Sequence, residues 1–172
     1  MTSRTDHLAG MGVPSRMLVL SSLDLDNPDL RHQLDTISER TARRFGVPAS
    51  VVVLVLDTAQ IFVGSYGVEG WIAAVQGTPV EWSFCSHAVA TGEPYIVPDA
   101  AVDPDQSDNP LVTVDGIRSY AGMPLKIDGQ VVGAHCVIGA TARSFNEDEL
   151  AELRRNADEI TELLNRHRVP AA

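Results

Sequence analysis

Cysteine is scarce in this sequence of 172 residues, where only Cys85 and Cys136 occur. Two isolated cysteines provide neither the paired spacing of a zinc site nor the framework of a disulfide-rich secreted domain. In a reducing compartment such residues commonly serve as small buried hydrophobes. We therefore expect two free thiols, no metal site and no cofactor.

Basic residues are also few, with 13 Lys and Arg against 23 Asp and Glu and a formal net charge of −10. Lysine occurs once, at Lys126. A protein that binds nucleic acid or an anionic membrane needs a basic face that neutralises phosphates. The composition therefore argues against both kinds of partner.

Long apolar runs are missing too, so the sequence predicts no transmembrane helix, which needs about 18 or more consecutive apolar residues. The first residues have no apolar core of the kind found in a signal peptide. We expect a disordered leader over residues 1–14, a single domain over 15–168 and a tail over 169–172. The expected location is the cytoplasm.

Two helices have clear start signals. Asn27 followed by Pro28 is typical of a helix N-terminus, and an apolar spacing of three to four residues continues to Gly46. Near the C-terminus, Asn146 and Glu149 have the spacing of a capping box before another apolar stripe. This second stripe is suited either to cover a sheet or to pair with a second subunit.

Between these helices the sequence is rich in β-strand signals. Residues 49–56 are β-branched and apolar throughout, and shorter strands are expected near 61–66 and 95–97. Residues 118–125 and 130–139 are joined by Asp128–Gly129, the favoured pair of a tight hairpin. The pattern predicts an α+β fold with helices on an antiparallel sheet. The long acidic connection over 98–116 is of a length usually found in functional loops.

The stretch S-F-C-S-H-A-V-A-T-G (83–92) contains the one candidate nucleophile, Cys85. Ser83 is suited to cap a short helix, which would place Cys85 in its first turn, where the helix dipole favours a thiolate. His87 lies two positions away and does not face Cys85 on a helix, so the geometry argues against a catalytic dyad. The alternative, which we favour, is that Cys85 lines a cavity or belongs to the core.

The order of motifs resembles a GAF domain. The similarity rests on S-F-C-S-H-A-V-A-T-G-E-P-Y-I-V-P-D-A (83–100), D-N-P-L-V-T (108–113), I-R-S-Y-A-G-M-P-L (117–125), G-A-H-C-V-I (133–138) and S-F-N-E-D-E-L (144–150), within residues 28–165. The resemblance implies a GAF/PAS-like α+β fold. A central antiparallel sheet of five or six strands carries the terminal helices on one face, and the short helix and long loop cover a ligand cavity on the other. Domains of this family mostly sense small molecules inside longer signalling proteins, whereas this sequence is expected to be a stand-alone domain of the bacterial signalling type.

Enzymatic and pigment-binding branches of this family carry residues that this chain lacks. One branch reduces free methionine-R-sulfoxide with several cysteines, but the loop where its catalytic cysteine would fall offers only Asp115, Gly116 and Ile117. The Asp-Ile-Pro segment of bilin-binding domains and the Asn-Lys pair of cyclic-nucleotide-binding domains are also missing. His87 and His135, the two histidines expected near the cavity, lack the carboxylates that would support a metal site.

The resemblance locates the candidate ligand site in the short helix, the loop and the strand after it. Each candidate also has a simpler explanation: Arg118 pairs with Asp99 or Asp103 to hold the loop, the residues of 103–110 make turn hydrogen bonds, and the aromatic residues belong to the core. The predicted ligand-binding residues are Trp82, Phe84, Cys85, His87, Tyr95, Asp99, Asp103, Asn109, Arg118 and Tyr120.

The function predicted from these observations is small-molecule sensing in signal transduction, by a homodimer that associates through its terminal helices and acts on a signalling partner. Two alternatives stay open. One is a thiol-dependent redox enzyme related to free methionine-R-sulfoxide reductase that uses Cys85 and Cys136. The other is a ligand-free dimeric interaction module whose cavity is filled by side chains.

Overall fold

A single antiparallel sheet forms the centre of the protein, and its computed structural model describes residues 5–170. The six strands lie in the order β3-β2-β1-β6-β5-β4, which confirms the predicted α+β class with the larger of the two expected strand numbers. Their bounds are β1 Ala49–Val55, β2 Ala59–Tyr66, β3 Gly77–Pro79, β4 Tyr95–Val97, β5 Ser119–Ile127 and β6 Gln130–Gly139.

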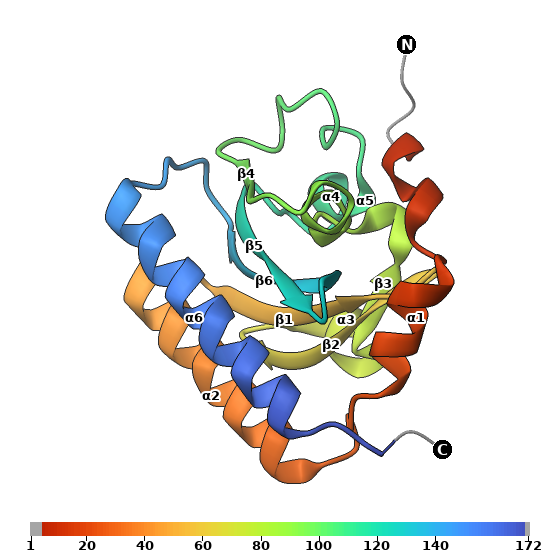
Figure 1. Ribbon diagram of the computed structural model, residues 1–172. Coiled ribbons are helices and arrows are strands. Elements are labelled where there is room, and N and C mark those ends of the chain that lie inside the picture. The colour runs from red at the N-terminus through yellow and green to blue at the C-terminus, as the bar shows by residue number, and fades with distance from the viewer. Residues whose placement is uncertain (1–4, 171–172) are drawn as a thin grey trace.

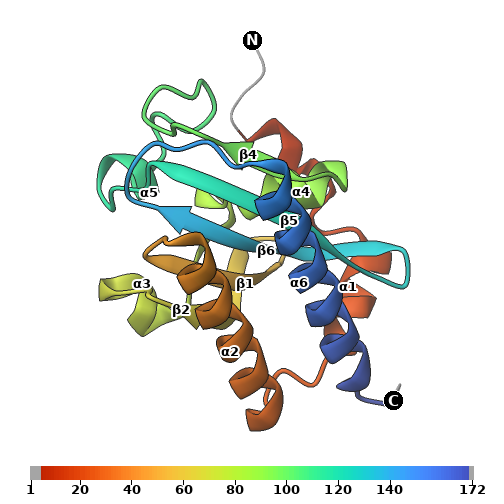
Figure 2. The same ribbon diagram turned by 90° about the vertical axis from the view of Figure 1, so that its left-hand side faces the viewer.

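Two long helices, α2 (Pro28–Phe45) and α6 (Glu147–Arg166), lie side by side across one face of this sheet (Figures 1 and 2). The Asn27 side chain accepts hydrogen bonds from the backbone N–H groups of Asp29 and Leu30, so α2 starts at the predicted cap. The predicted capping box of α6 is present as well. The apolar stripe of α6 is buried against the sheet in the monomer, which settles what that stripe covers.

Shorter elements cover the other face. The helix α4 (Cys85–Thr91) crosses it, and α3 (Gly70–Val75), the 3-10 helix η2 (Val80–Trp82) and α5 (Pro110–Thr113) lie around it. Figure 1 shows α4 and α5 on the side of the sheet opposite to α2 and α6. The sheet therefore separates two hydrophobic cores, one beneath the long helices and one beneath α4.

The N-terminal segment carries structure where a disordered leader is expected. Residues Asp6–Gly10 form the 3-10 helix η1, and α1 spans Pro14–Ser21. Met11 between them is only 3% exposed and belongs to the core beneath α4. Residues 1–4 and 171–172 lie outside the described residues. At the other end, the Val169 N–H donates to the Ser22 carbonyl, which joins the start of the expected tail to the end of α1.

The turn at Asp128–Gly129 forms as predicted. Both residues have positive φ angles, 51° and 77°, which the tight hairpin turn between two twisted strands requires. The resulting register places Gly122 of β5 opposite Cys136 of β6. Because side chains alternate along a strand, His135 and Cys136 point to opposite faces of the sheet.

Candidate functional site

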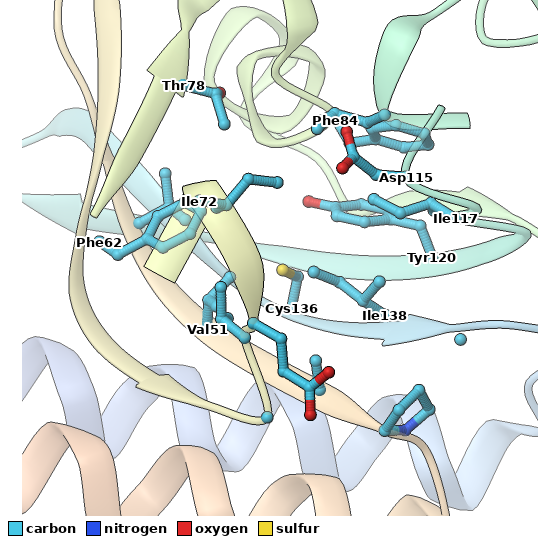
Figure 3. A pocket seen from close by; sticks show the side chains of 18 of the residues that line it. Val51, Phe62, Ile72, Thr78, Phe84, Asp115, Ile117, Tyr120, Cys136 and Ile138 are labelled. Atoms are coloured by element: carbon cyan, nitrogen blue, oxygen red, sulfur yellow. The ribbon is translucent and has the colours of Figure 1, made fainter. Parts of the chain in front are cut away.

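A cavity of about 440 Å³ lies between the sheet and the elements that cover its α4 face. Strands β1, β2 and β6 form its floor, α3 and α4 form its sides, and the segment after α5 lies at its mouth (Figure 3). The residues that line it are Pro48, Ala49, Val51, Val53, Gln60, Phe62, Gly67, Val68, Glu69, Gly70, Ile72, Thr78, Phe84, Cys85, Leu111, Asp115, Gly116, Ile117, Tyr120, Cys136, Ile138, Gly139 and Ala140.

The cavity wall is mostly apolar. Figure 3 shows Val51, Phe62 and Ile72 on one side of the space and Tyr120 and Ile138 on the other. The rings of Phe84 and Tyr120 are in contact, with centroids 5.1 Å apart. An apolar ligand therefore meets aliphatic and aromatic surface on several sides, which is the usual composition of a small-molecule site.

The buried polar side chains of the wall are already paired with one another. The Gln60 amide donates to Thr78 Oγ1 at 2.7 Å, and the Ser83 hydroxyl donates to Gln60 Oε1 at 2.6 Å. The Ser83 oxygen in turn accepts from the Ser86 N–H at 3.0 Å, although α4 begins at Cys85 and its N-cap is Phe84 in place of the predicted Ser83. This chain of hydrogen bonds ties the start of α4 to β2 and β3, and it leaves Gln60 with little capacity for a ligand.

Tyr120, Cys85 and Cys136 form a cluster at the cavity wall. The Tyr120 hydroxyl donates to Cys85 Sγ at 2.9 Å, and Cys85 Sγ lies 3.9 Å from Cys136 Sγ. Burial raises the pKa values of Tyr120 and of Cys136 well above their usual ranges, so both groups keep their protons at neutral pH. Gly122 makes room for this arrangement, because an added Cβ would overlap the Tyr120 hydroxyl.

The charged residues of the lining are all acidic. Glu69 and Asp115 are exposed side chains that reach the cavity, and Asp115 accepts a hydrogen bond from Trp71 Nε1 at 3.2 Å. No lysine, arginine or histidine is among the lining residues of the described chain. The cavity therefore offers an anion no counter-charge.

Three of the ten predicted ligand-binding residues, Phe84, Cys85 and Tyr120, line this cavity. His87 and Tyr95 lie outside it and stack on each other, with ring centroids 4.3 Å apart. The Gln106 amide contacts both, at 3.2 Å from His87 Nε2 and 2.9 Å from the Tyr95 hydroxyl.

The other five predicted residues also lie outside the cavity lining. The Asn109 side chain caps α5 and donates to the carbonyl of Trp82, and Arg118 donates to the carbonyls of Val112 and Ile117 at 3.0 Å each. Asp99 and Asp103 accept from the N–H groups of Ala101 and Asp105, as turn residues commonly do. These contacts hold the 98–116 loop together.

Among the residues that the sequence analysis missed, one group lies in the segment between β2 and β3 and in β3 itself. Gly67, Val68, Gly70, Ile72 and Thr78 line the cavity, yet neither α3 nor β3 is predicted. The sequence signal for this segment was the close spacing of Gly64, Gly67 and Gly70. Such glycines indicate that regular structure is interrupted, but they do not show where the segment packs.

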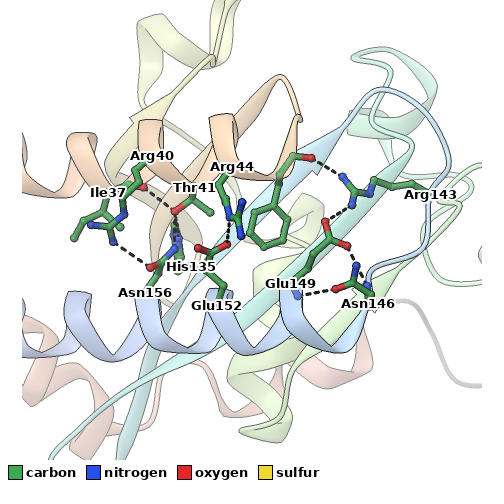
Figure 4. Close-up of polar contacts among 11 residues, drawn as sticks. Ile37, Arg40, Thr41, Arg44, His135, Arg143, Asn146, Glu149, Glu152 and Asn156 are labelled. Carbon is green, nitrogen blue, oxygen red and sulfur yellow. Dashed lines mark hydrogen bonds and ion pairs between the residues drawn. The ribbon is translucent and has the colours of Figure 1, made fainter.

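His135 lies on the helix side of the sheet and not near the cavity, contrary to expectation. It is fully buried, its Nδ1 is 3.1 Å from the Val51 carbonyl, and its Nε2 is 3.1 Å from Thr41 Oγ1 of α2. Asn156 of α6 donates to the same Thr41 oxygen (Figure 4). Within the described residues, no group of three or more His, Cys, Asp or Glu is arranged to hold a metal ion.

The comparison with known proteins decides the family. A model of the GAF domain matches residues 29–163. The chain belongs to the GAF domain family. A cyclic di-GMP phosphodiesterase of Pseudomonas aeruginosa is 30% identical over 131 residues, which cover 75% of this chain and 22% of that protein. This GAF domain is therefore related to signalling proteins, and it spans about a fifth of that relative's length.

Solved structures share the fold at lower identity. The GAF domain of a phosphoenolpyruvate-protein phosphotransferase from Acinetobacter superposes with a TM-score of 0.65 at 15% identity, covering 96% of each chain. A type II free methionine-R-sulfoxide reductase from Thermoplasma acidophilum reaches a TM-score of 0.68 at 15% identity, covering 85% of this chain and 99% of that one. At these identities the likeness shows the fold alone. Among residues 5–170, none of the helices has the length and hydropathy needed to span a membrane.

Proposed function

We propose that this GAF domain is a sensor that binds a small, mainly apolar molecule without negative charge in the cavity beneath α4. The observation that carries this proposal is the cavity of about 440 Å³, which is lined by apolar side chains and, among charged ones, only by acids. Its volume lies within the usual range of small-molecule sites. We further propose a cytoplasmic location and regulation of a signalling partner.

The charge pattern supports the exclusion of anionic ligands. Transfer of a phosphate or carboxylate into an apolar site is costly unless a cation compensates for the lost hydration. The nearest predicted candidate, Arg118, already donates to two backbone carbonyls and does not line the cavity. An uncharged molecule, or an amine whose ammonium group lies near Asp115 or Glu69, meets no such penalty.

Ligand binding would be transmitted through the 98–116 loop. Leu111, Asp115 and Gly116 of this connection line the cavity, so a bound molecule contacts the loop directly. A ligand shifts a conformational equilibrium only if it binds the two states with different affinity. We propose that the other predicted residues, including Asn109 and Arg118, set the position of the loop and that Phe84, Cys85 and Tyr120 contact the ligand.

Native mass spectrometry of freshly purified protein, beside its denatured mass, tests this proposal first. A non-covalent adduct of neutral or cationic type would support it, and the adduct's mass would begin its identification. Three indoles of similar size then test charge selectivity by calorimetry: tryptophol (neutral), tryptamine (cationic) and indole-3-propionate (anionic). We expect the first two to bind at least about tenfold more tightly than the anion, which corresponds to about 1.4 kcal/mol.

Two matched variants show whether binding occurs in the cavity. Ile138→Trp adds an aromatic ring to a lining residue and should abolish binding, whereas Leu18→Trp changes a residue of α1 that is 70% exposed and should have no effect. Tighter binding of indole-3-propionate than of tryptophol would contradict the charge argument. A bare protein that binds none of the probes would favour the ligand-free interaction module.

A further inference from the structure

The chain's two cysteines, which are far apart in sequence, meet in the wall of the cavity. Cys85 is the first residue of α4, and Cys136 lies in β6 on the cavity face of the sheet. Their sulfur atoms are 3.9 Å apart, and both residues are unpaired thiols. A disulfide bond joins two sulfurs at about 2.05 Å, so the pair needs to close by roughly 2 Å to form one.

Both sulfurs are reachable through the cavity although they are hidden from bulk solvent. Cys85 is 3% exposed and Cys136 is 1% exposed. The cavity that they line is also lined by the exposed residues Glu69, Asp115 and Ala140, so it continues to the protein surface. A small reagent that enters the cavity therefore reaches the thiols, and the apolar wall favours a reagent with an apolar body.

We propose that Cys85 and Cys136 form an oxidation site, at which an organic hydroperoxide that enters the cavity converts the two thiols into a disulfide. In the first step the Cys85 sulfur attacks the outer oxygen of the hydroperoxide, the O–O bond breaks, and the corresponding alcohol leaves with a proton. Cys85 becomes a sulfenic acid. In the second step the Cys136 sulfur attacks the Cys85 sulfur, and the sulfenic hydroxyl leaves as water with the Cys136 proton. In sum, two thiols and one hydroperoxide give one disulfide, one alcohol and one water.

The environment of the two sulfurs assigns their roles. The Tyr120 hydroxyl donates to Cys85 Sγ at 2.9 Å and so holds this sulfur in a fixed position at the cavity wall. Burial raises the pKa of Cys136, which keeps it protonated and makes it the weaker nucleophile toward the peroxide. Cys85 therefore reacts first, Cys136 resolves the sulfenic acid, and Tyr120 is a positioning residue.

Formation of the disulfide would change the cavity. Closing the gap between the sulfurs draws the start of α4 toward β6, and Phe84, which precedes Cys85, is part of the cavity wall. The oxidation itself is independent of any ligand, whereas its effect on ligand binding rests on the proposed function. We expect the oxidised protein to bind tryptophol about fivefold or more weakly than the reduced protein.

Cumene hydroperoxide is the probe for the oxidation site, and intact-mass spectrometry under non-reducing conditions is the measurement. The mass of the monomer should decrease by two hydrogen atoms. After denaturation, neither cysteine should react with iodoacetamide. Dithiothreitol should reverse both changes. Because the chain has only two cysteines, an intramolecular loss of two hydrogens identifies the Cys85–Cys136 bond. Hydrogen peroxide, which lacks an apolar body, should react about tenfold more slowly.

Variants separate the two steps. Cys136→Ala should stop at a sulfenic acid on Cys85, which dimedone traps with a defined mass increase, and Cys85→Ala should leave Cys136 reduced under the same conditions. Tyr120→Phe keeps the aromatic ring and removes the hydrogen bond, so it should slow oxidation about tenfold and reduce the pH dependence of its rate. Circular dichroism on each variant verifies that it is folded.

Three results would overturn the proposal. The first is an unchanged mass with both thiols still free, the second is a disulfide-linked dimer in place of the monomeric product, and the third is oxidation of Cys136 in Cys85→Ala at the wild-type rate. If the disulfide forms but tryptophol binding is unchanged, the site stands and its coupling to the cavity is wrong. If tryptophol does not bind the reduced protein either, the proposed function fails while the oxidation site stands.

Discussion

At the scale of single residues, burial decides what a titratable group does in this domain. His135 lies beneath α2, and its Nδ1 contacts the Val51 carbonyl oxygen. Because a carbonyl oxygen can only accept a hydrogen bond, the neutral imidazole carries its proton on Nδ1. Burial, the largest cause, lowers the pKa of His135 to about 4. The same side chain type at His87 is partly exposed and stacks on Tyr95. Sequence alone does not distinguish the two.

The buried imidazole predicts a loss of stability on mild acidification. The folded pKa of about 4 lies below the unfolded value of about 6.5, so the contribution is fully present above pH 6.5 and is lost as the pH falls toward 4. The full loss is about 3 kcal/mol by linkage. Urea unfolding at pH 7.0 and pH 5.0 measures the part of this loss that falls above pH 5.0, about 2 kcal/mol. His135→Gln should show a much smaller difference between the two pH values.

The Glu149 carboxylate does not contribute to the stability change between pH 7.0 and 5.0. Burial pushes the pKa of Glu149 up, but the Asn146 N–H and the Arg143 guanidinium outweigh it, so the pKa is lowered overall. The stabilisation by this carboxylate is therefore lost only as the pH falls below its unfolded value of about 4.3. If His135→Gln lost as much stability between pH 7.0 and 5.0 as wild type, the imidazole would not be the cause.

At the scale of secondary-structure elements, helix ends and close strand contacts fix the frame around the cavity. The start of α6 is held by the reciprocal bonds of Asn146 and Glu149, and Glu149 also pairs with Arg143, which donates to the Phe45 carbonyl of α2 (Figure 4). One short segment thus caps its own helix and joins it to the end of the neighbouring one.

Removal of the α6 cap should therefore lower the stability of the whole domain. For Asn146→Ala we expect a decrease in unfolding free energy of about 1–2 kcal/mol, because the Glu149 N–H loses its acceptor. Glu162→Ala, an exposed substitution within the same helix, is the matched control and should change stability by less than about 0.5 kcal/mol. Equal effects of the two substitutions in urea titrations would show that the cap contributes nothing specific.

The contact between β1 and β6 gives a second prediction at this scale. An added Cβ at Gly133 would overlap the Val53 carbonyl oxygen, so Gly133→Ala must push the two central strands apart. We expect a loss of about 1–3 kcal/mol, measured by thermal and urea unfolding. Gly10→Ala adds the same methyl group where nothing lies within 4 Å and should leave the stability nearly unchanged. If Gly133→Ala left the unfolding free energy unchanged, the two strands would have enough space for the added methyl group.

At the scale of the whole molecule, the two faces of the sheet have different roles. The face under α2 and α6 is closed by a continuous apolar core, whereas the face under α4 contains the cavity. The outward sides of the two long helices carry ion pairs such as Arg40–Glu159 and Arg44–Glu152. The apolar residues of both helices are already buried against the sheet within one chain. Association through these helices would therefore depend on polar contacts.

The predicted homodimer can be tested on that basis. If it forms through α2 and α6, we expect it to weaken as salt rises from about 0.05 to 0.5 M, because added ions screen charges at the surface. Sedimentation velocity at both salt concentrations measures this. Arg40→Glu reverses a charge that faces outward and should shift the equilibrium toward monomer, whereas Leu18→Glu on α1 should not. A monomer at all concentrations would contradict the dimer, and a salt-resistant dimer would indicate another interface.

Much of the frame follows from local chemistry. The caps at Asn27 and Asn146 and the turn at Asp128–Gly129 form where the sequence predicts them, because each depends on hydrogen bonds or φ angles within a few residues. The order of motifs likewise led to the GAF fold. The site was predicted less completely, since α3 and β3 depend on packing over Phe62 and the sheet and have no strong local signal of their own.

By itself, the sequence determined the two long helices, the main strands and their order, and the acidic character that leaves few cations for a ligand. Adjacent residues of a strand must face opposite sides, so it also required His135 and Cys136 to be separated by the sheet. Only the tertiary structure decided which side holds the helices and which the cavity, because that choice depends on how distant segments pack. The same packing brought Cys85 within 3.9 Å of Cys136 and kept Arg118 out of the cavity.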